Sequence, residues 1–188
     1  NAGAPWVAAR ACALSDIPFV INSTDNVFDV QGSRPYRVDD PTAPLGVYGD
    51  SKLAGEDAVR SVGGRHLILR TAWVYGRHGH NFMKTMLRLG AERDELRVVA
   101  DQVGTPTPAA LIADVTTELL GLRDAPSGTF HLTPRGETSW HGFAEAILEE
   151  ALARGLIPRA PKVIPIATSD YPTRARRPGY SRLDIGWL

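Results

Sequence analysis

A tyrosine and a lysine four residues apart, Tyr48 and Lys52, are the first candidates for chemistry in this sequence. Residues at this spacing lie on one face of a helix. A nearby ammonium group stabilises a phenolate, so the pair could give and take a proton more readily than a lone tyrosine. The spacing alone is also typical of an exposed helical pair without chemistry, so the surrounding sequence must decide between the two interpretations.

Polar residues follow two apolar runs that are typical of buried strands. Thr24 and Asp25 come after the run 17–22, and Thr71 follows the run 66–70. In an open parallel sheet, ligands bind at the carboxyl ends of the strands. The sequence therefore predicts that these residues converge at one edge of a sheet.

The order of the predicted elements indicates an α/β fold. We expect helices at 3–14, 48–62, 82–92, 109–122 and 139–154, and strands at 17–22, 66–70, 96–100, 129–132 and 163–166. Strands that alternate with helices are typical of parallel sheets with crossover helices. Segments 26–47 and 101–108 are punctuated by Gly and Pro and are predicted to be loops.

Composition limits the class of protein. The 188 residues are 43% hydrophobic and 22% charged, with a formal net charge of +0. This argues against a nucleic-acid protein whose affinity rests on positive charge. No apolar run approaches the ~20 residues that span a bilayer. The single cysteine, Cys12, permits no disulfide within the chain, which fits a cytoplasmic location.

Several familiar catalytic motifs are absent from the sequence. It has neither a Gly-x-Ser-x-Gly elbow nor the phosphate-binding loop of P-loop NTPases. His78 and His80 lack the Cys or carboxylate partners of a metal site, so no metal is expected. A Gly-rich turn for a dinucleotide pyrophosphate is also missing, because Gly63 and Gly64 end a predicted helix rather than open one.

With a strand that ends in Ser-Thr-Asp, a long loop and then the segment around Tyr48 and Lys52, the sequence resembles the extended short-chain dehydrogenase/reductase family and, within it, the dTDP-4-dehydrorhamnose reductase group. The resemblance covers nearly the whole chain. The segments that carry it, in order, are 23–25, 48–56 (Tyr-Gly-Asp-Ser-Lys-Leu-Ala-Gly-Glu), 69–75, 81–87, 98–107, 138–140, 171–173, 177–178 and 181–184.

The resemblance implies hydride transfer from NADPH or NADH to the C4 ketone of a dTDP-4-keto-6-deoxyhexose, dTDP-4-dehydrorhamnose to dTDP-L-rhamnose. It implies that Tyr48 protonates the ketone oxygen and that Lys52 holds the nicotinamide ribose. It also implies that Thr24 hydrogen-bonds the same oxygen and stabilises its developing charge. The alternative for Thr24 is that it only caps a turn.

Further residues are assigned roles by the same resemblance. Asp25 and Trp73 would position the sugar, and Thr71 would lie near the nicotinamide ring. The alternative for Trp73 is a place in the core. Asp101 and Gln102 either contact a ligand or close a loop. Three arginines either contact the diphosphate or form a solvated tail: Arg174, Arg176 and Arg177.

The sequence departs from the family pattern in ways that leave alternatives open. Asn26 stands where the family usually has Tyr, which puts the exact sugar in question. The amino-terminal part with the pyrophosphate site is missing, so we expect a fragment that is inactive alone. The rival interpretations are a non-catalytic regulatory subunit and a related sugar-nucleotide reductase or epimerase for antibiotic sugars.

The expected organisation is a partial Rossmann-type parallel sheet with a small discontinuous α/β substrate lobe. Residues 1–70 would form the second half of the dinucleotide-binding domain. Residues 71–188 would form the substrate lobe, interleaved with the last Rossmann elements at about 109–132. The expected partner is a dTDP-sugar, with neither nucleic acid nor membrane, and a homodimer is compatible with this organisation.

Overall fold

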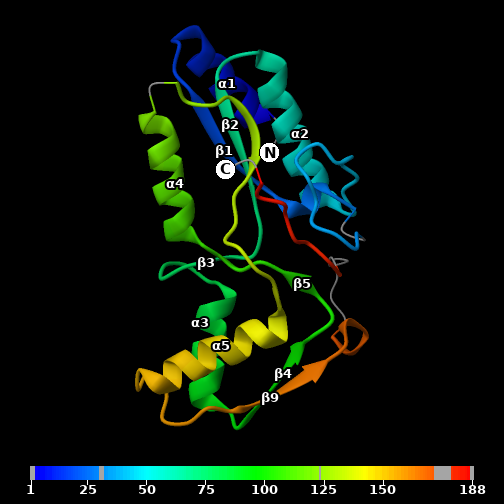
Figure 1. Ribbon diagram of the computed structural model, residues 1–188, viewed down its shortest axis with the longest axis vertical. Coiled ribbons are helices and arrows are strands. Elements are labelled where there is room, and N and C mark those ends of the chain that lie inside the picture. The colour runs from blue at the N-terminus through cyan, green and yellow to red at the C-terminus, as the bar shows by residue number, and fades with distance from the viewer. Residues whose placement is uncertain (1–2, 30–31, 123, 172–178, 187–188) are drawn as a thin grey trace.

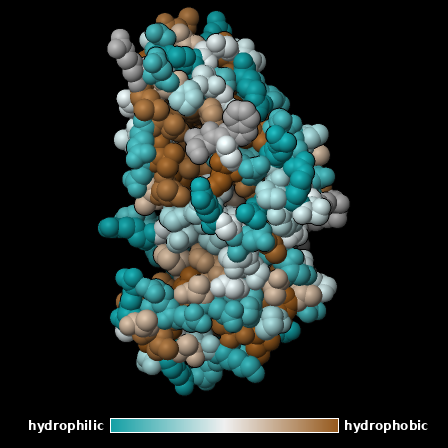
Figure 2. Space-filling model, viewed as in Figure 1, coloured by the Kyte–Doolittle hydropathy of each residue, from teal (hydrophilic) through white to brown (hydrophobic). Residues whose placement is uncertain are grey.

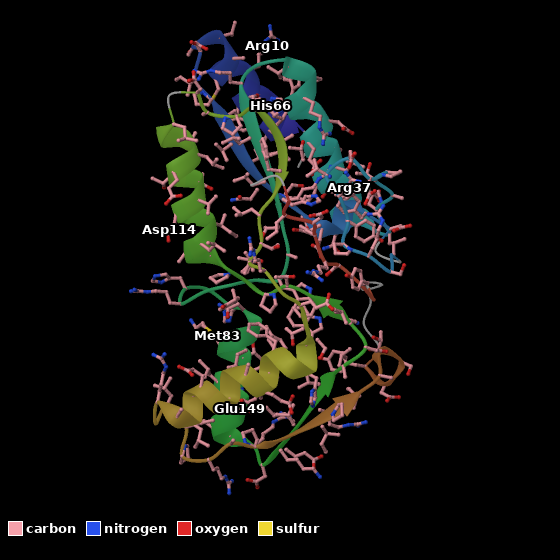
Figure 3. The ribbon with its side chains drawn as sticks, in the orientation of Figure 1. Arg10, Arg37, His66, Met83, Asp114 and Glu149 are labelled. Atoms are coloured by element: carbon pink, nitrogen blue, oxygen red, sulfur yellow. The ribbon has the colours of Figure 1, made fainter. Side chains whose placement is uncertain are left out.

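The largest sheet has three parallel strands. In the computed structural model these are, in spatial order, β1 (Phe19–Thr24), β2 (His66–Thr71) and β7 (Gly128–His131). The structure describes residues 3–29, 32–122, 124–171 and 179–186. The strands start at the end of the molecule where Figure 3 labels His66 and run toward a second lobe, so their carboxyl ends face the junction (Figure 1). The predicted α/β fold with a parallel sheet is confirmed.

Helices cover both faces of this sheet. One face carries α1 (Gly3–Leu14) and α2 (Val47–Val62), and the other carries α4 (Ala109–Gly121) (Figure 1). Side chains of β2 alternate between the faces, because Ile68 packs with Val59 of α2 whereas Leu67 and Leu69 pack with Ile112 of α4. In the part of the chain that the structure describes, no helix is both long and apolar enough to cross a bilayer.

The second lobe surrounds its own apolar core. It consists of α3 (Phe82–Glu92), α5 (Trp140–Ala153) and the parallel strands β4 (Glu95–Val99) and β9 (Lys162–Ile166). Its buried centre includes Met86, Leu96 and Leu148. Pro165 lies opposite Val98, and β9 tolerates this proline because β4 is its single sheet neighbour among the described residues.

Two-residue strands join the lobes. They are β3 (Val74–Tyr75) with β6 (Thr107–Pro108), and β5 (Val103–Gly104) with β8 (Thr138–Ser139). The prediction that 101–108 is all loop is therefore wrong, because two residues are too few to show an alternating pattern. Short 3-10 helices lie at η1 (Asp25–Val27) and η2 (Thr168–Asp170).

Residues 179–186 connect both lobes through their backbone. The Asp184 N–H donates to the Tyr36 carbonyl at 2.7 Å, which attaches the segment to the first lobe, the one built on the three-stranded sheet. The Ser181 N–H donates to the Val103 carbonyl in β5 at 2.9 Å. One short segment thus holds two regions that lie far apart in the sequence.

Hydrophobic surface remains open beside α4 (Figure 2). A hollow of about 500 Å³ lies there, next to the side chains of His131 and Thr133. Its apolar lining residues are Leu111, Val115, Leu119, Leu122, Leu132 and Ile185. Figure 3 labels Asp114 on this helix, on the opposite side of the sheet from Arg37 in the segment 26–47.

The first turn of α2 packs closely on η1 through Gly49. A Cβ atom at Gly49 would overlap the Asn26 carbonyl oxygen and lie 2.8 Å from the Pro44 Cβ. Because a backbone atom cannot swing aside as a side chain can, this contact requires glycine and fixes the distance between α2 and η1.

We expect Gly49→Ala to lower the free energy of unfolding by about 1–3 kcal/mol, because α2 and η1 must separate to admit the methyl group. Urea unfolding measures this loss. Gly121→Ala is the matched control, since no described atom lies within 4 Å of a Cβ there. Equal stabilities of the two variants would contradict the close contact.

The imidazole of His131, at the end of β7, is buried and neutral. Its Nδ1–H donates to the Asp184 carbonyl at 2.9 Å, and Nε2 has no partner among the described residues. Burial lowers the pKa of His131 to about 4, helped by the charge of Arg70 and opposed by the hydrogen bond to Asp184. Protonation of this imidazole therefore opposes folding.

We expect acid to destabilise the protein through His131. In the unfolded chain this imidazole takes up a proton as the pH falls below 6.5, whereas in the folded chain it does so near 4. Stability is therefore lost between these pH values, by up to about 3 kcal/mol. Urea unfolding at pH 7 and pH 4.5 should show a larger loss for the wild type than for His131→Gln, and parallel losses would refute the assignment.

Candidate functional site

The strands β1 and β2 end side by side, each in a threonine. Thr24 and Thr71 are partners in the parallel register, and both are buried. The Thr71 hydroxyl has no hydrogen-bond partner among the described residues. A buried hydroxyl without a partner is costly, so a ligand with a polar group at this position would be bound favourably.

A hydrogen-bonded cluster surrounds Thr24. Its hydroxyl donates to Asp25 Oδ1 at 2.9 Å and accepts from Asn26, at 3.0 Å from Nδ2 and at 3.2 Å from the backbone N–H. Asn26 Nδ2 also lies 2.9 Å from Asp25 Oδ1, to which it donates. To donate to any other oxygen, Thr24 must turn its proton away from Asp25.

Asp25 lies buried at the start of η1. Burial raises the pKa of Asp25 above its ordinary value, although hydrogen bonds from Thr24, Ser181 and Asn26 act in the opposite direction. The carboxyl group is thus held by three neighbours and shielded from water, which suits a group that orients polar neighbours.

Tyr48 and Lys52 occupy the first two turns of α2. Tyr48 is 58% exposed, whereas Lys52 is half-buried. The Lys52 ammonium donates to the Asn22 carbonyl at 2.5 Å, two residues before Thr24 in β1. This bond uses one of the three ammonium donors and attaches the Lys52 side chain to β1, two residues before its end.

Trp73 lies two residues beyond β2, against the second lobe. Its indole stacks on Trp140 with ring centroids 3.6 Å apart and planes 8° apart. A Cβ at Gly104 would come within 2.5 Å of the indole Cε2. The φ of Trp73 is 48°, a left-handed conformation that is rare for a bulky residue. The stacking of Trp73 on Trp140 supports the core interpretation. The side chain is only half-buried, which is compatible with the interpretation that it contacts the sugar.

Asp101 and Gln102 hold the loop that follows β4. The Asp101 carboxylate accepts from the Thr168 hydroxyl at 2.6 Å and from its N–H at 2.9 Å, and these bonds lower the pKa of Asp101. Gln102 accepts from Trp140 Nε1 at 3.1 Å and donates to Thr168 at 3.0 Å. These contacts support the loop-closing interpretation. The basic candidates of the tail lie outside the described residues: Arg174, Arg176 and Arg177.

Four of the predicted residues gather at the ends of β1 and β2: Thr24, Asp25, Thr71 and Lys52. Ser181 connects this group to Trp73, because it hydrogen-bonds Asp25 and, like Trp73, lies against Gly104. The sequence alone indicates no role for Ser181, which is far from the others along the chain. Glu56 also belongs to this region, and its spacing of four from Lys52 is the signal that could have found it.

Known proteins resemble this chain over nearly its full length. The dTDP-4-dehydrorhamnose reductase of Burkholderia thailandensis is 49% identical, over 97% of this chain and 64% of that protein. The crystal structure of the Bacillus anthracis dTDP-4-dehydrorhamnose reductase in complex with NADP superimposes with a TM-score of 0.91 and 36% identity, over 99% of this chain and 63% of that one. The crystal structure of a dTDP-4-dehydrorhamnose reductase from Clostridium acetobutylicum superimposes with a TM-score of 0.86 and 40% identity, over 96% of this chain and 61% of that one.

The chain therefore spans somewhat less than two thirds of the length of these relatives. The family described as RmlD substrate binding domain matches residues 1–187, so this chain belongs to that family.

Proposed function

We propose that the protein containing this chain reduces the C4 ketone of a dTDP-4-keto-6-deoxyhexose with NADPH or NADH, converting dTDP-4-dehydrorhamnose to dTDP-L-rhamnose. One observation carries the proposal beyond family membership. The bond from Lys52 to the Asn22 carbonyl attaches the helix that carries Tyr48 to β1, two residues before Thr24. A proton donor, a cation and a second hydroxyl are the groups that ketone reduction needs, and Tyr48, Lys52 and Thr24 are our candidates for them.

The residues at the strand ends fit the nicotinamide end of such a cofactor. Thr71 offers a buried hydroxyl without a partner in the described part of the chain, and Lys52 has further donors for ribose hydroxyls. The Bacillus anthracis relative was crystallised with NADP. The cofactor, when bound, supplies the hydride that reduces the ketone carbon.

The remaining chemistry falls to side chains of this chain. The Tyr48 hydroxyl gives its proton to the ketone oxygen, which becomes the product hydroxyl, and the Lys52 ammonium stabilises the resulting phenolate. Thr24 donates to the same oxygen once its proton has turned away from Asp25. Asp25 and Trp73 position the sugar.

Asn26 favours a second candidate function, a related sugar-nucleotide reductase or epimerase. The Asn26 side-chain amide donates hydrogen bonds to both Thr24 and Asp25, so it lies next to the atoms that would contact the sugar. The regulatory-subunit alternative is weaker, because Thr24, Tyr48 and Lys52 are all present.

The organisation of the whole protein is part of the proposal. We assign residues 1–70 to the cofactor-binding domain, together with about 109–132 as its last Rossmann elements. The remainder of 71–188 is assigned to the substrate lobe. The three-stranded sheet supports this division, because β7 and α4 pack with β2 rather than with the second lobe. A cytoplasmic location and a homodimer stay predictions.

We expect Tyr48→Phe in the complete protein to lower kcat by about 10²–10⁴-fold, because the proton donor is lost. Oxidation of NADPH and NADH is followed with dTDP-4-keto-L-rhamnose as substrate. Lys52→Ala should lower kcat and also raise KM for the cofactor. Tyr75→Phe is the control for removing a tyrosine hydroxyl and should keep wild-type activity, since Tyr75 packs against Phe143 in the second lobe.

An unchanged kcat of the Tyr48→Phe variant would contradict the proposed mechanism. A wild-type protein that binds the nucleotide sugar without turnover would point to another keto sugar, and Asn26→Tyr would then be the first variant to test. A wild-type protein with neither turnover nor binding would support the regulatory alternative.

A further inference from the structure

Glu56 occupies the same face of α2 as the proposed catalytic pair. It lies four residues after Lys52 and eight after Tyr48, so the three side chains follow one stripe of the helix. The Glu56 side chain is completely buried. A carboxylate in such a position needs partners for its charge and lone pairs.

Two partners of Glu56 come from the strands that end at the site, and a third, Arg60, belongs to α2 itself and lies 2.5 Å from Oε2. Ser23 of β1 donates its hydroxyl to Oε1 at 2.5 Å. Arg70 of β2 binds both oxygens, with Nε 3.0 Å from Oε1 and Nη2 2.8 Å from Oε2. Ser23 and Arg70 are partners in the parallel register, and each directly precedes a threonine of the site, Thr24 or Thr71.

The Glu56 group stays ionised. Burial raises its pKa, but the hydrogen bonds and charge of Arg70, with help from Ser23 and Arg60, outweigh burial and bring the pKa below its ordinary value. Arg70 is itself held, because its guanidinium lies 5.0 Å from the ring centre of Phe28. The pair is therefore a charge-assisted, two-pronged contact with a fixed geometry.

We propose that Glu56 is a positioning residue for the reduction, which fixes the stripe of Tyr48 and Lys52 relative to the strand ends with Thr24 and Thr71. This role rests on the proposed function. The hydrogen-bond partners of Glu56 in the described structure are Ser23, Arg60 and Arg70, none of which is a proposed reacting group. Glu56 acts by making any sliding of α2 along the sheet break several charged hydrogen bonds at once. Misplacement by about 1 Å can cost on the order of 10²-fold in rate.

The competing interpretation is an ion pair that only stabilises the fold. The two are separated by exchanging the pair for apolar residues, Glu56→Leu with Arg70→Met, since such exchanges often preserve stability. Ser23→Ala is a milder variant, which removes one hydroxyl bond from the carboxylate. Asp57→Asn is the matched control, because Asp57 is the next residue of the helix, is exposed, and also contacts Arg60.

The complete protein is assayed with NADPH and dTDP-4-keto-L-rhamnose, and rates are expressed per folded molecule from circular dichroism. We expect kcat of the double variant to fall about 10–100-fold while KM for the keto sugar changes less than about three-fold. Ser23→Ala should show a smaller fall of the same kind, and Asp57→Asn should behave as wild type.

A folded double variant with wild-type kcat would overturn the positioning role. If the double variant does not fold, Ser23→Ala decides: a lowered kcat at unchanged KM for the keto sugar supports the role, and wild-type kinetics reject it. A wild-type protein that reduces neither dTDP-4-keto-L-rhamnose nor another keto sugar would instead overturn the proposed function, and this role with it.

Discussion

The buried carboxylate of Glu56 is the constraint on which the arrangement of the first lobe depends. A charge without access to water is stable only where hydrogen bonds and an opposite charge replace the solvent. Besides Arg60 of the same helix, these replacements come from two different strands, through Ser23 and Arg70. The helix, both strand ends and the residues next to them must therefore stay together. The close contact at Gly49 adds a second fixed point at the start of the same helix.

At the junction between the lobes, aromatic packing surrounds a residue with a strained backbone. Trp73 keeps a left-handed conformation that costs on the order of 1–3 kcal/mol for a residue of this kind. The stacking on Trp140 and the small Gly104 beside the indole offset this cost. The orientation of the Trp73 indole is thus set by contacts with the second lobe, although Trp73 directly follows β2 of the first lobe. Its orientation would respond to any movement between the lobes.

The sequence predicts those features that depend on local patterns. The apolar runs before Thr24 and Thr71 predict two neighbouring strands of the sheet, and the segment that begins at Tyr48 is predicted as a helix. Contacts between distant segments are different. The pairing of Glu56 with Arg70 and the bond from Ser181 to Asp25 depend on which chains the fold brings together. Two-residue strands such as β5 and β8 depend on their partner for any regular structure, so no local signal marks them.

The bonds that residues 179–186 make to Tyr36 and Val103 affect the order in which a growing chain can acquire its structure. A ribosome releases the segment 26–47 long before it has made Asp184, so Tyr36 must wait for its backbone partner. The helices and strands of the first lobe can form meanwhile, since their contacts are complete earlier. The surroundings of Asp25 cannot form at this stage, because its hydrogen-bond partner Ser181 belongs to the segment that is synthesised last. A nascent chain would therefore pass through a stage in which its sheet is folded but its proposed active site is still open.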